Sequence, residues 1–128
     1  MKTIGLLGGM SWQSTVPYYQ TINAETAARL GGFHSAKMLI YNVDFAELED
    51  NMTTGNWAGN AAILADAAAR LEAAGADLML IATNTMHKVA RQVQAAAGVP
   101  LLHIAEATRD EIKKAACKRW GCWARGIP

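Results

Sequence analysis

Three hydrogen-bonding side chains stand in a row in the stretch "ATNTMHK", directly after the apolar run "LMLIA". Thr83, Asn84 and Thr85 are therefore expected where a buried strand ends and a helix begins. Hydroxyl and amide groups at the mouth of a strand are suited to hydrogen-bonding a carboxylate ligand. Threonine and asparagine are also good helix N-caps, so an ordinary capping role is the alternative interpretation.

Two other loops carry residues that could bind a ligand. In "GLLGGMS", the small residues Gly8 and Gly9 would let backbone N–H groups approach an anion at the start of a helix. The stretch is neither G-x-G-x-x-G nor a P-loop, because no lysine follows the glycines. A tight turn that packs a helix closely on a strand is an equal alternative. Asp44, in "NVDF", could hold a substrate amine or cap the next helix.

The histidines and cysteines do not form a recognisable catalytic or metal-binding group. His34, His87 and His103 are far apart and make no HxH or HExxH pattern, so no metal is expected. His87 is interpreted as a helix-surface residue, and the sequence identifies no partner for the other two. Cys117 and Cys122 are too few for a disulfide framework or a zinc site, and we expect reduced thiols.

Apolar runs and amphipathic segments alternate along the chain. Strands are expected at residues 2–7, 36–45, 77–82 and 100–105, and helices at residues 11–30, 55–75, 86–98 and 106–117. This order predicts an α/β fold with a parallel sheet of about four strands, right-handed crossovers and helices on both faces. In such sheets, ligand-binding residues gather at the carboxyl ends of the strands, where the three loops described above and a fourth, "HIAEAT", would lie.

Composition limits the possible partners and locations. The chain has 128 residues, enough for one domain, with 52% hydrophobic and 18% charged residues. A net charge of +1 gives no reason to expect a nucleic acid or an anionic membrane as partner. The apolar run at the N-terminus is too short for a signal peptide, and no run approaches the ~18 residues of a membrane helix. A cytoplasmic location is expected.

Four segments taken together resemble the aspartate/glutamate racemase family, in the same order and spacing. They are "MKTIGLLGGMSWQST", "HSAKMLIYNVDFAELE", "AAGADLMLIATNTMHKVA" and "VPLLHIAEAT". The resemblance extends from residue 1 to about Arg119 and is strongest to broad-specificity racemases of enterobacterial type. It implies two similar α/β lobes, of which residues 1–119 would be the first, with the active site between them. It also implies catalysis without pyridoxal phosphate, metal or any other cofactor, and a homodimer is compatible with it.

The resemblance assigns a role to each residue of the polar loops. In most family members a cysteine of each lobe acts as a base, and the first heads a "CNT" sequence; here Thr83 stands in its place. A subset of the family has this threonine and favours L-substrates. Asn84 and Thr85 would hold the carboxylate of aspartate or glutamate, and Met10 and Ser11 would help to enclose it.

The end of the chain departs from the family. After "KR", related sequences continue with a glycine-rich strand of the type "VGLLGTRYT", whereas residues 120–128 read "WGCWARGIP". Deleting the first base of a suitable coding sequence for the former yields all nine residues of the latter. Residues 120–128 are therefore expected to be an out-of-frame tail, and neither cysteine matches the position of the second-lobe base.

Three functions remain open on the sequence. The first is a racemase family member that is inactive in this form because the second base is missing. The second is a non-catalytic carboxylate-binding or dimer-forming module. The third, a nucleotide- or phosphate-binding domain, depends only on the Gly8–Gly9 loop and is not favoured by the "TNT" stretch.

Overall fold

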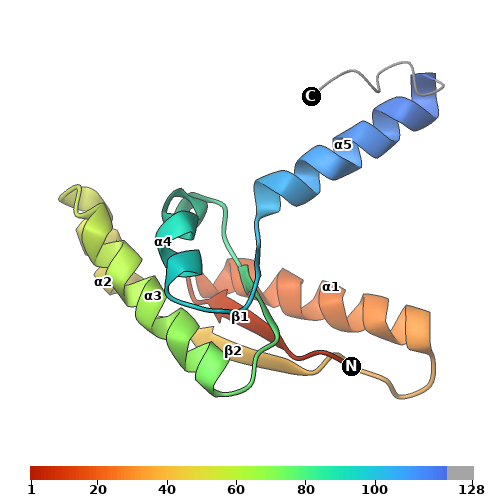
Figure 1. Cartoon of the computed structure of the whole chain (residues 1–128), viewed down its shortest axis with the longest axis horizontal. Coiled ribbons are helices and arrows are strands. Elements are labelled where there is room, and N and C mark those ends of the chain that lie inside the picture. The colour runs from red at the N-terminus through yellow and green to blue at the C-terminus, as the bar shows by residue number, and fades with distance from the viewer. Residues whose placement is uncertain (121–128) are drawn as a thin grey trace.

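The computed structural model describes residues 1–120 and is built on one sheet of four parallel strands (Figure 1). The strands are β1 (Ile4–Gly8), β2 (Met38–Asn42), β3 (Leu78–Ile81) and β4 (Leu101–Leu102), in the order β2-β1-β3-β4. Helices α1 (Trp12–Leu30), α2 (Phe45–Thr53), α3 (Trp57–Ala73), α4 (Ala90–Ala95) and α5 (Ile104–Trp120) connect or follow them, with a 3₁₀ helix η1 (Thr85–Val89) ahead of α4. The predicted α/β class and parallel sheet are confirmed.

Strand β1 lies at the centre and sets the position of its neighbours. Leu6 of β1 is in register with Ile40 of β2 and with Leu80 of β3. Beyond the strands, the backbone N–H of Ala82 donates to the carbonyl of Leu7 over 2.9 Å. Because all strands point the same way, the loops that follow them leave the sheet at one edge.

The hydrophobic core lies on one face of the sheet, between the strands and helices α2, α3 and α4. Leu7, Met79 and Ile81 point to this face and pack with Leu64 of α3 and Val93 of α4. The crossovers from β2 to β3 and from β3 to β4 run in the same direction across the sheet. Right-handed connections therefore place α3 and α4 together, and α1 alone on the opposite face.

The opposite face is only partly covered. Leu6 is fully buried there, but Ile40 is 43% exposed and Leu102 is 51% exposed. A groove of about 310 Å³ runs between α1 and β2, with an apolar wall that includes Val16 and Tyr19. Helix α5 extends away from the sheet and leaves this face open (Figure 1).

Several expected boundaries were wrong, and one helix was missed. Residues 36–45 were expected as one strand, but β2 ends at Asn42 and α2 begins at Phe45. Helix α2 is short and acidic and follows β2 after only two residues, and Leu48 is its buried residue. The expected helix at residues 86–98 is a 3₁₀ turn followed by the short α4, and β4 has two residues instead of six.

The core arrangement predicts a large difference between two leucines that both lie in helices. Leu64→Ala should lower the free energy of unfolding by about 2–5 kcal/mol, because Leu64 is fully buried. Leu30→Ala should change it by about 0.5 kcal/mol or less, because Leu30 is 54% exposed. Urea unfolding followed by circular dichroism measures both, and equal losses would contradict this assignment of the core.

Candidate functional site

The polar side chains of the loop after β3 make no hydrogen bond to other described parts of the protein. Thr83 is half-buried, and Asn84 and Thr85 are exposed. Asn84 is the N-cap of η1, yet its side chain makes no capping hydrogen bond. Within residues 1–120, none of these three side chains hydrogen-bonds another protein group. Side-chain capping therefore does not account for the "TNT" stretch, and its hydroxyl and amide groups are available to a ligand.

In the glycine loop after β1, by contrast, a residue of the following helix α1 accepts the hydrogen bond of the Gly9 amide. The buried N–H of Gly9 donates to Oγ1 of Thr15 over 2.9 Å, and the Thr15 hydroxyl donates to the carbonyl of Ser11 over 3.4 Å. A Cβ at Gly8 would lie 2.6 Å from Cγ2 of Thr15. Gly9 has φ +92°, and a Cβ there would lie 2.4 Å from the carbonyl oxygen of Val43. Both glycines thus serve close packing, and the Gly9 amide is already bonded to Thr15.

The other predicted site residues take different positions around this loop. Met10 is 2% exposed and packs in the core. Ser11 and Asp44 line a cavity of about 670 Å³ between the ends of β1 and β2, together with Trp12 and Asn42. Oδ1 of Asp44 accepts the N–H of Ala46 over 3.1 Å, so Asp44 does cap α2.

The structure therefore brings together only part of the predicted site. Ser11 and Asp44 share one cavity, whereas the side chain of Met10 belongs to the core. Thr83, Asn84 and Thr85 lie at the same sheet edge but do not line that cavity. In the described part of the chain, the loops after β1, β2 and β3 lie at one edge of the sheet, but they do not enclose a shared cavity.

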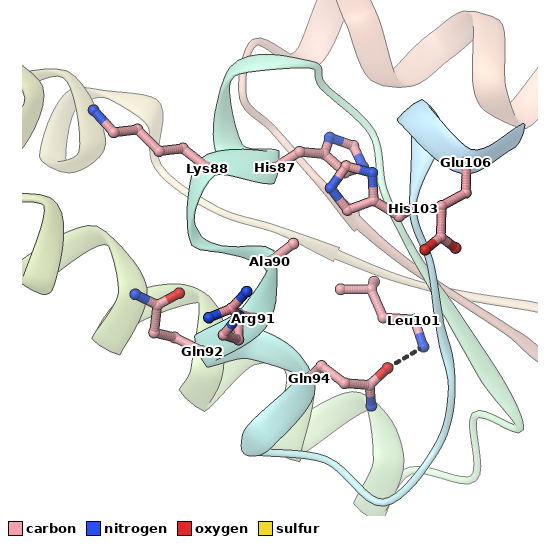
Figure 2. A pocket seen from close by; sticks show the side chains of 9 residues that line it. All are labelled: His87, Lys88, Ala90, Arg91, Gln92, Gln94, Leu101, His103 and Glu106. Atoms are coloured by element: carbon pink, nitrogen blue, oxygen red, sulfur yellow. Dashed lines mark hydrogen bonds between the residues drawn. The ribbon is translucent and has the colours of Figure 1, made fainter. Parts of the chain in front are cut away.

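A second concave region lies beside η1 and contains two histidines that sequence reasoning did not pair (Figure 2). This cavity of about 640 Å³ is lined by His87, His103, Arg91 and Glu106, among others. The rings of His87 and His103 lie 4.6 Å apart, centroid to centroid, with their planes tilted by 57°. Each histidine follows a strand, and β3 and β4 are neighbours, which is the signal that could have predicted the contact.

His87 is a half-buried residue, so its interpretation as a helix-surface residue was wrong. Nε2 of His87 accepts the backbone N–H of Ile104 over 3.3 Å, and Nδ1 is buried with no hydrogen-bond partner. Burial lowers the pKa of His87, and the nearby His103 lowers it further, while the carbonyls of Thr83 and Asn84 oppose the shift. The imidazole is accordingly neutral near pH 7.

Two other expectations concern cysteines and metals. In the part of the chain that the structure describes, no three His, Cys, Asp or Glu side chains are placed to hold a metal ion. The structure does not describe the side chains of Cys117 and Cys122, so the expectation of reduced thiols is not tested. The expected out-of-frame tail at residues 120–128 likewise lies outside the described side chains. Within residues 1–120, no helix is long and apolar enough to span a bilayer.

The fold and site define a class: a parallel α/β domain in which the loops after β1, β2 and β3 carry polar side chains at one edge of the sheet. Residues 7–123 match the Asp/Glu/Hydantoin racemase family, and the chain belongs to this family. It is 31% identical over 118 residues to the broad specificity amino-acid racemase RacX of Bacillus subtilis strain 168, which covers 90% of this chain.

Two solved structures have the same fold. A protein from Yersinia pestis described as an Asp/Glu racemase superposes with a TM-score of 0.88 at 52% identity over 91% of this chain. An aspartate racemase homologue from Pyrococcus horikoshii OT3 superposes with a TM-score of 0.80 at 36% identity over 90% of it. The chain spans about half the length of each of these relatives, 51% of the Bacillus protein and 50% of both solved chains.

The Thr15 bond gives a prediction about the loop after β1. Thr15→Val keeps the shape of the side chain but leaves the buried Gly9 N–H without an acceptor, which should cost about 1–3 kcal/mol of folding free energy. Thr15→Ser, the matched control, keeps the hydroxyl and loses one methyl group, about 0.8 kcal/mol. Urea unfolding measures the cost, and only Thr15→Val should accelerate hydrogen exchange at the Gly9 amide. Equal exchange in both variants would contradict the assigned bond.

Proposed function

We propose that this chain supplies one wall of the active site of a cofactor-independent amino-acid racemase that acts on aspartate and glutamate. The observation that carries the proposal is the row Thr83, Asn84 and Thr85, whose side chains have no partner in the described part of the chain. These groups lie at the carboxyl edge of a parallel sheet, in a member of the racemase family. Asn84 and Thr85 bind the substrate carboxylate, and Thr83 faces the α-carbon.

The chemistry assigns Thr83 to proton donation. An α-proton beside a carboxylate is a very weak acid, so the group that removes it must be a strong, close base shielded from water. A threonine hydroxyl is a poor base, but it can protonate a carbanion that already exists. The stronger base is then a cysteine, because a thiol with a pKa of roughly 8.5 is readily held as a thiolate.

The loop residues after β1 and β2 have supporting roles. Ser11 is half-buried beside the cavity that Asp44 also lines, so both can reach a ligand there. Asp44 uses Oδ1 to cap α2, and its exposed carboxylate holds the substrate amine. Met10 encloses the substrate through its backbone and through the core packing of its side chain, which fixes the position of Ser11.

The second base belongs to a second lobe of the racemase fold. The relatives are about twice as long as this chain, which supports assigning residues 1–119 to the first of two lobes. Neither Cys117 nor Cys122 matches the position of the second-lobe cysteine. Residues 1–128 therefore hold half of a two-base site, in a protein that we place in the cytoplasm.

The uncovered sheet face favours a second candidate, a carboxylate-binding module that forms dimers. Trp12 is 61% exposed and Tyr19 is 50% exposed, and both border the apolar groove beside β2. Burying such side chains against another copy would be favourable. Sedimentation equilibrium of the chain distinguishes a dimer from a monomer, whichever function the polar edge has.

The half-site predicts binding without catalysis. L-Aspartate should shift the amide resonances of Thr83, Asn84 and Thr85 in ¹⁵N-labelled chain, because the carboxylate would accept hydrogen bonds there. The same chain should show no α-proton exchange in D₂O and no loss of optical rotation at high protein concentration. Asn84→Ala should abolish the shifts, and Asn23→Ala, remote from the loop, should leave them unchanged. Racemisation at the rate of a full-length relative would disprove the half-site.

Thr83 can be tested in a chimera of residues 1–119 with the second half of the Yersinia pestis relative. Thr83→Ala should lower net racemisation by about 100-fold or more, the range expected for loss of a general acid. Some α-proton exchange without inversion should survive, because the cysteine can return a proton to the face it came from. Thr83→Cys should make the two directions more nearly equal, since both faces would then carry thiols.

The control for this chimera is Thr21→Ala, which changes an exposed threonine of α1 and should leave both directions unaltered. Exchange in D₂O, with each enantiomer quantified from each starting isomer, separates exchange from inversion. Unchanged inversion in Thr83→Ala would assign Thr83 a structural role only.

A further inference from the structure

A hydrogen bond to a titratable side chain connects η1 to the start of α5, and we call this bond the tie. Nε2 of His87 accepts the N–H of Ile104, the first residue of α5. The first N–H groups of a helix have no acceptor within the helix, so a side chain must supply one or water must. We propose that His87 is a positioning residue that ties the substrate loop to the start of α5, and that its protonation releases the tie.

The direction of the bond requires a neutral imidazole. A neutral histidine has one N–H and one acceptor nitrogen, so a bond accepted at Nε2 places the proton on Nδ1. A protonated ring donates at both nitrogens and would face the Ile104 N–H with an N–H of its own. Protonation therefore removes this hydrogen bond and sets two donors against each other.

The surroundings of His87 favour the neutral ring. Its Nδ1 is buried, and burial is the main reason that its pKa is lowered. The charged or titratable groups around it are His103 at the end of β4, Glu106 on α5, Arg91 on α4 and the adjacent Lys88. Lys88 places Nζ over the ring of Trp57, 4.2 Å from its centroid, and so points away from the histidines. None of the described ion pairs involves His87.

The tie reaches the substrate loop through one turn of chain. The N–H of His87 donates to the carbonyl of Asn84 over 3.1 Å, so the imidazole and the carboxylate-binding loop belong to one short rigid segment. On the other side, the carbonyl of His103 accepts N–H groups of Glu106 and Ala107 at the first turn of α5. The link from loop to helix exists in the structure itself, and only its meaning for substrate binding depends on the proposed function.

The pH dependence has a definite sign. A lowered pKa in the folded state means that folding favours the neutral ring. The contribution of the tie is complete above the ordinary histidine pKa of about 6.5 and is lost as pH falls through the lowered pKa of folded His87. The start of α5 should therefore open in acid while the sheet remains folded.

Hydrogen exchange and chemical shifts of the ¹⁵N-labelled 128-residue chain test this tie. In the wild-type chain, the protection factor of the Ile104 amide should fall roughly three- to tenfold on protonation, the worth of one hydrogen bond. The fall should follow the titration of the His87 ring, with the Asn84 amide shift changing at the same pH. The Leu7 amide in β1 reports whether the sheet stays folded.

Two variants and a control make the test specific. His87→Gln retains an acceptor without a titratable proton, so Ile104 should stay protected at every pH. His87→Leu removes the acceptor, so Ile104 should be unprotected even at pH 7.5 while Leu7 remains protected. His34→Gln makes the same chemical change at an exposed histidine and should behave as wild type.

The outcomes separate this inference from the proposed function. The tie would be overturned if the protection of the Ile104 amide did not change as His87 titrates, or if it persisted in His87→Leu. This would hold even if aspartate binds to the loop. Conversely, a titrating tie in a chain that binds no aspartate would leave the positioning role of His87 for the loop intact and reject the substrate assignment. If His87→Gln lost protection as His87→Leu does, acceptance at Nε2 would not be the cause.

Discussion

The pairing of β1 with β2 on one side and β3 on the other is the constraint on which the rest of the structure depends. Two backbone bonds extend this pairing past the strand ends, from Val43 to the carbonyl of Gly8 and from Ala82 to that of Leu7, each 2.9 Å long. They bring the loops after three strands to one edge of the sheet. The buried Leu7 supports this centre from the core side, so the position of the candidate site and the stability of the core have the same origin.

The loops at that edge differ in how they satisfy their polar groups, and this difference separates structure from function. The loop after β1 is closed by Thr15, and the loop after β2 is closed by the cap from Asp44. The loop after β3 presents Thr83, Asn84 and Thr85 without side-chain partners in the described part of the chain. Exposed polar groups at a sheet edge bind water when no protein group pairs with them, so the third loop can exchange water for a ligand, as the proposed function requires.

One face of the sheet is open in the described part of the chain. One helix covers one face of a four-stranded sheet, leaving Ile40 and Leu102 exposed, and α5 extends away from it (Figure 1). The site likewise has one wall. The relatives of the racemase family are about twice as long as this chain, so the proposed second wall would come from residues beyond the matched half. The hydrogen bond between His87 and Ile104 links the 3₁₀ helix after β3 to the start of α5.

The sequence by itself determined the alternation of strands and helices along the chain, the parallel α/β class, the family and the place of Thr83 just after a strand, because apolar runs, turn residues and loop motifs are local patterns. The order of the strands within the sheet came only from the structure. The sequence did not reveal α2, whose acidic sequence has one buried anchor, or the burial of Met10. Only the tertiary structure decided that the Gly9 amide is bonded to Thr15 and that His87 meets His103 and Ile104. These contacts depend on how neighbouring strands bring separate loops together, and residue types along a chain do not encode that distance directly.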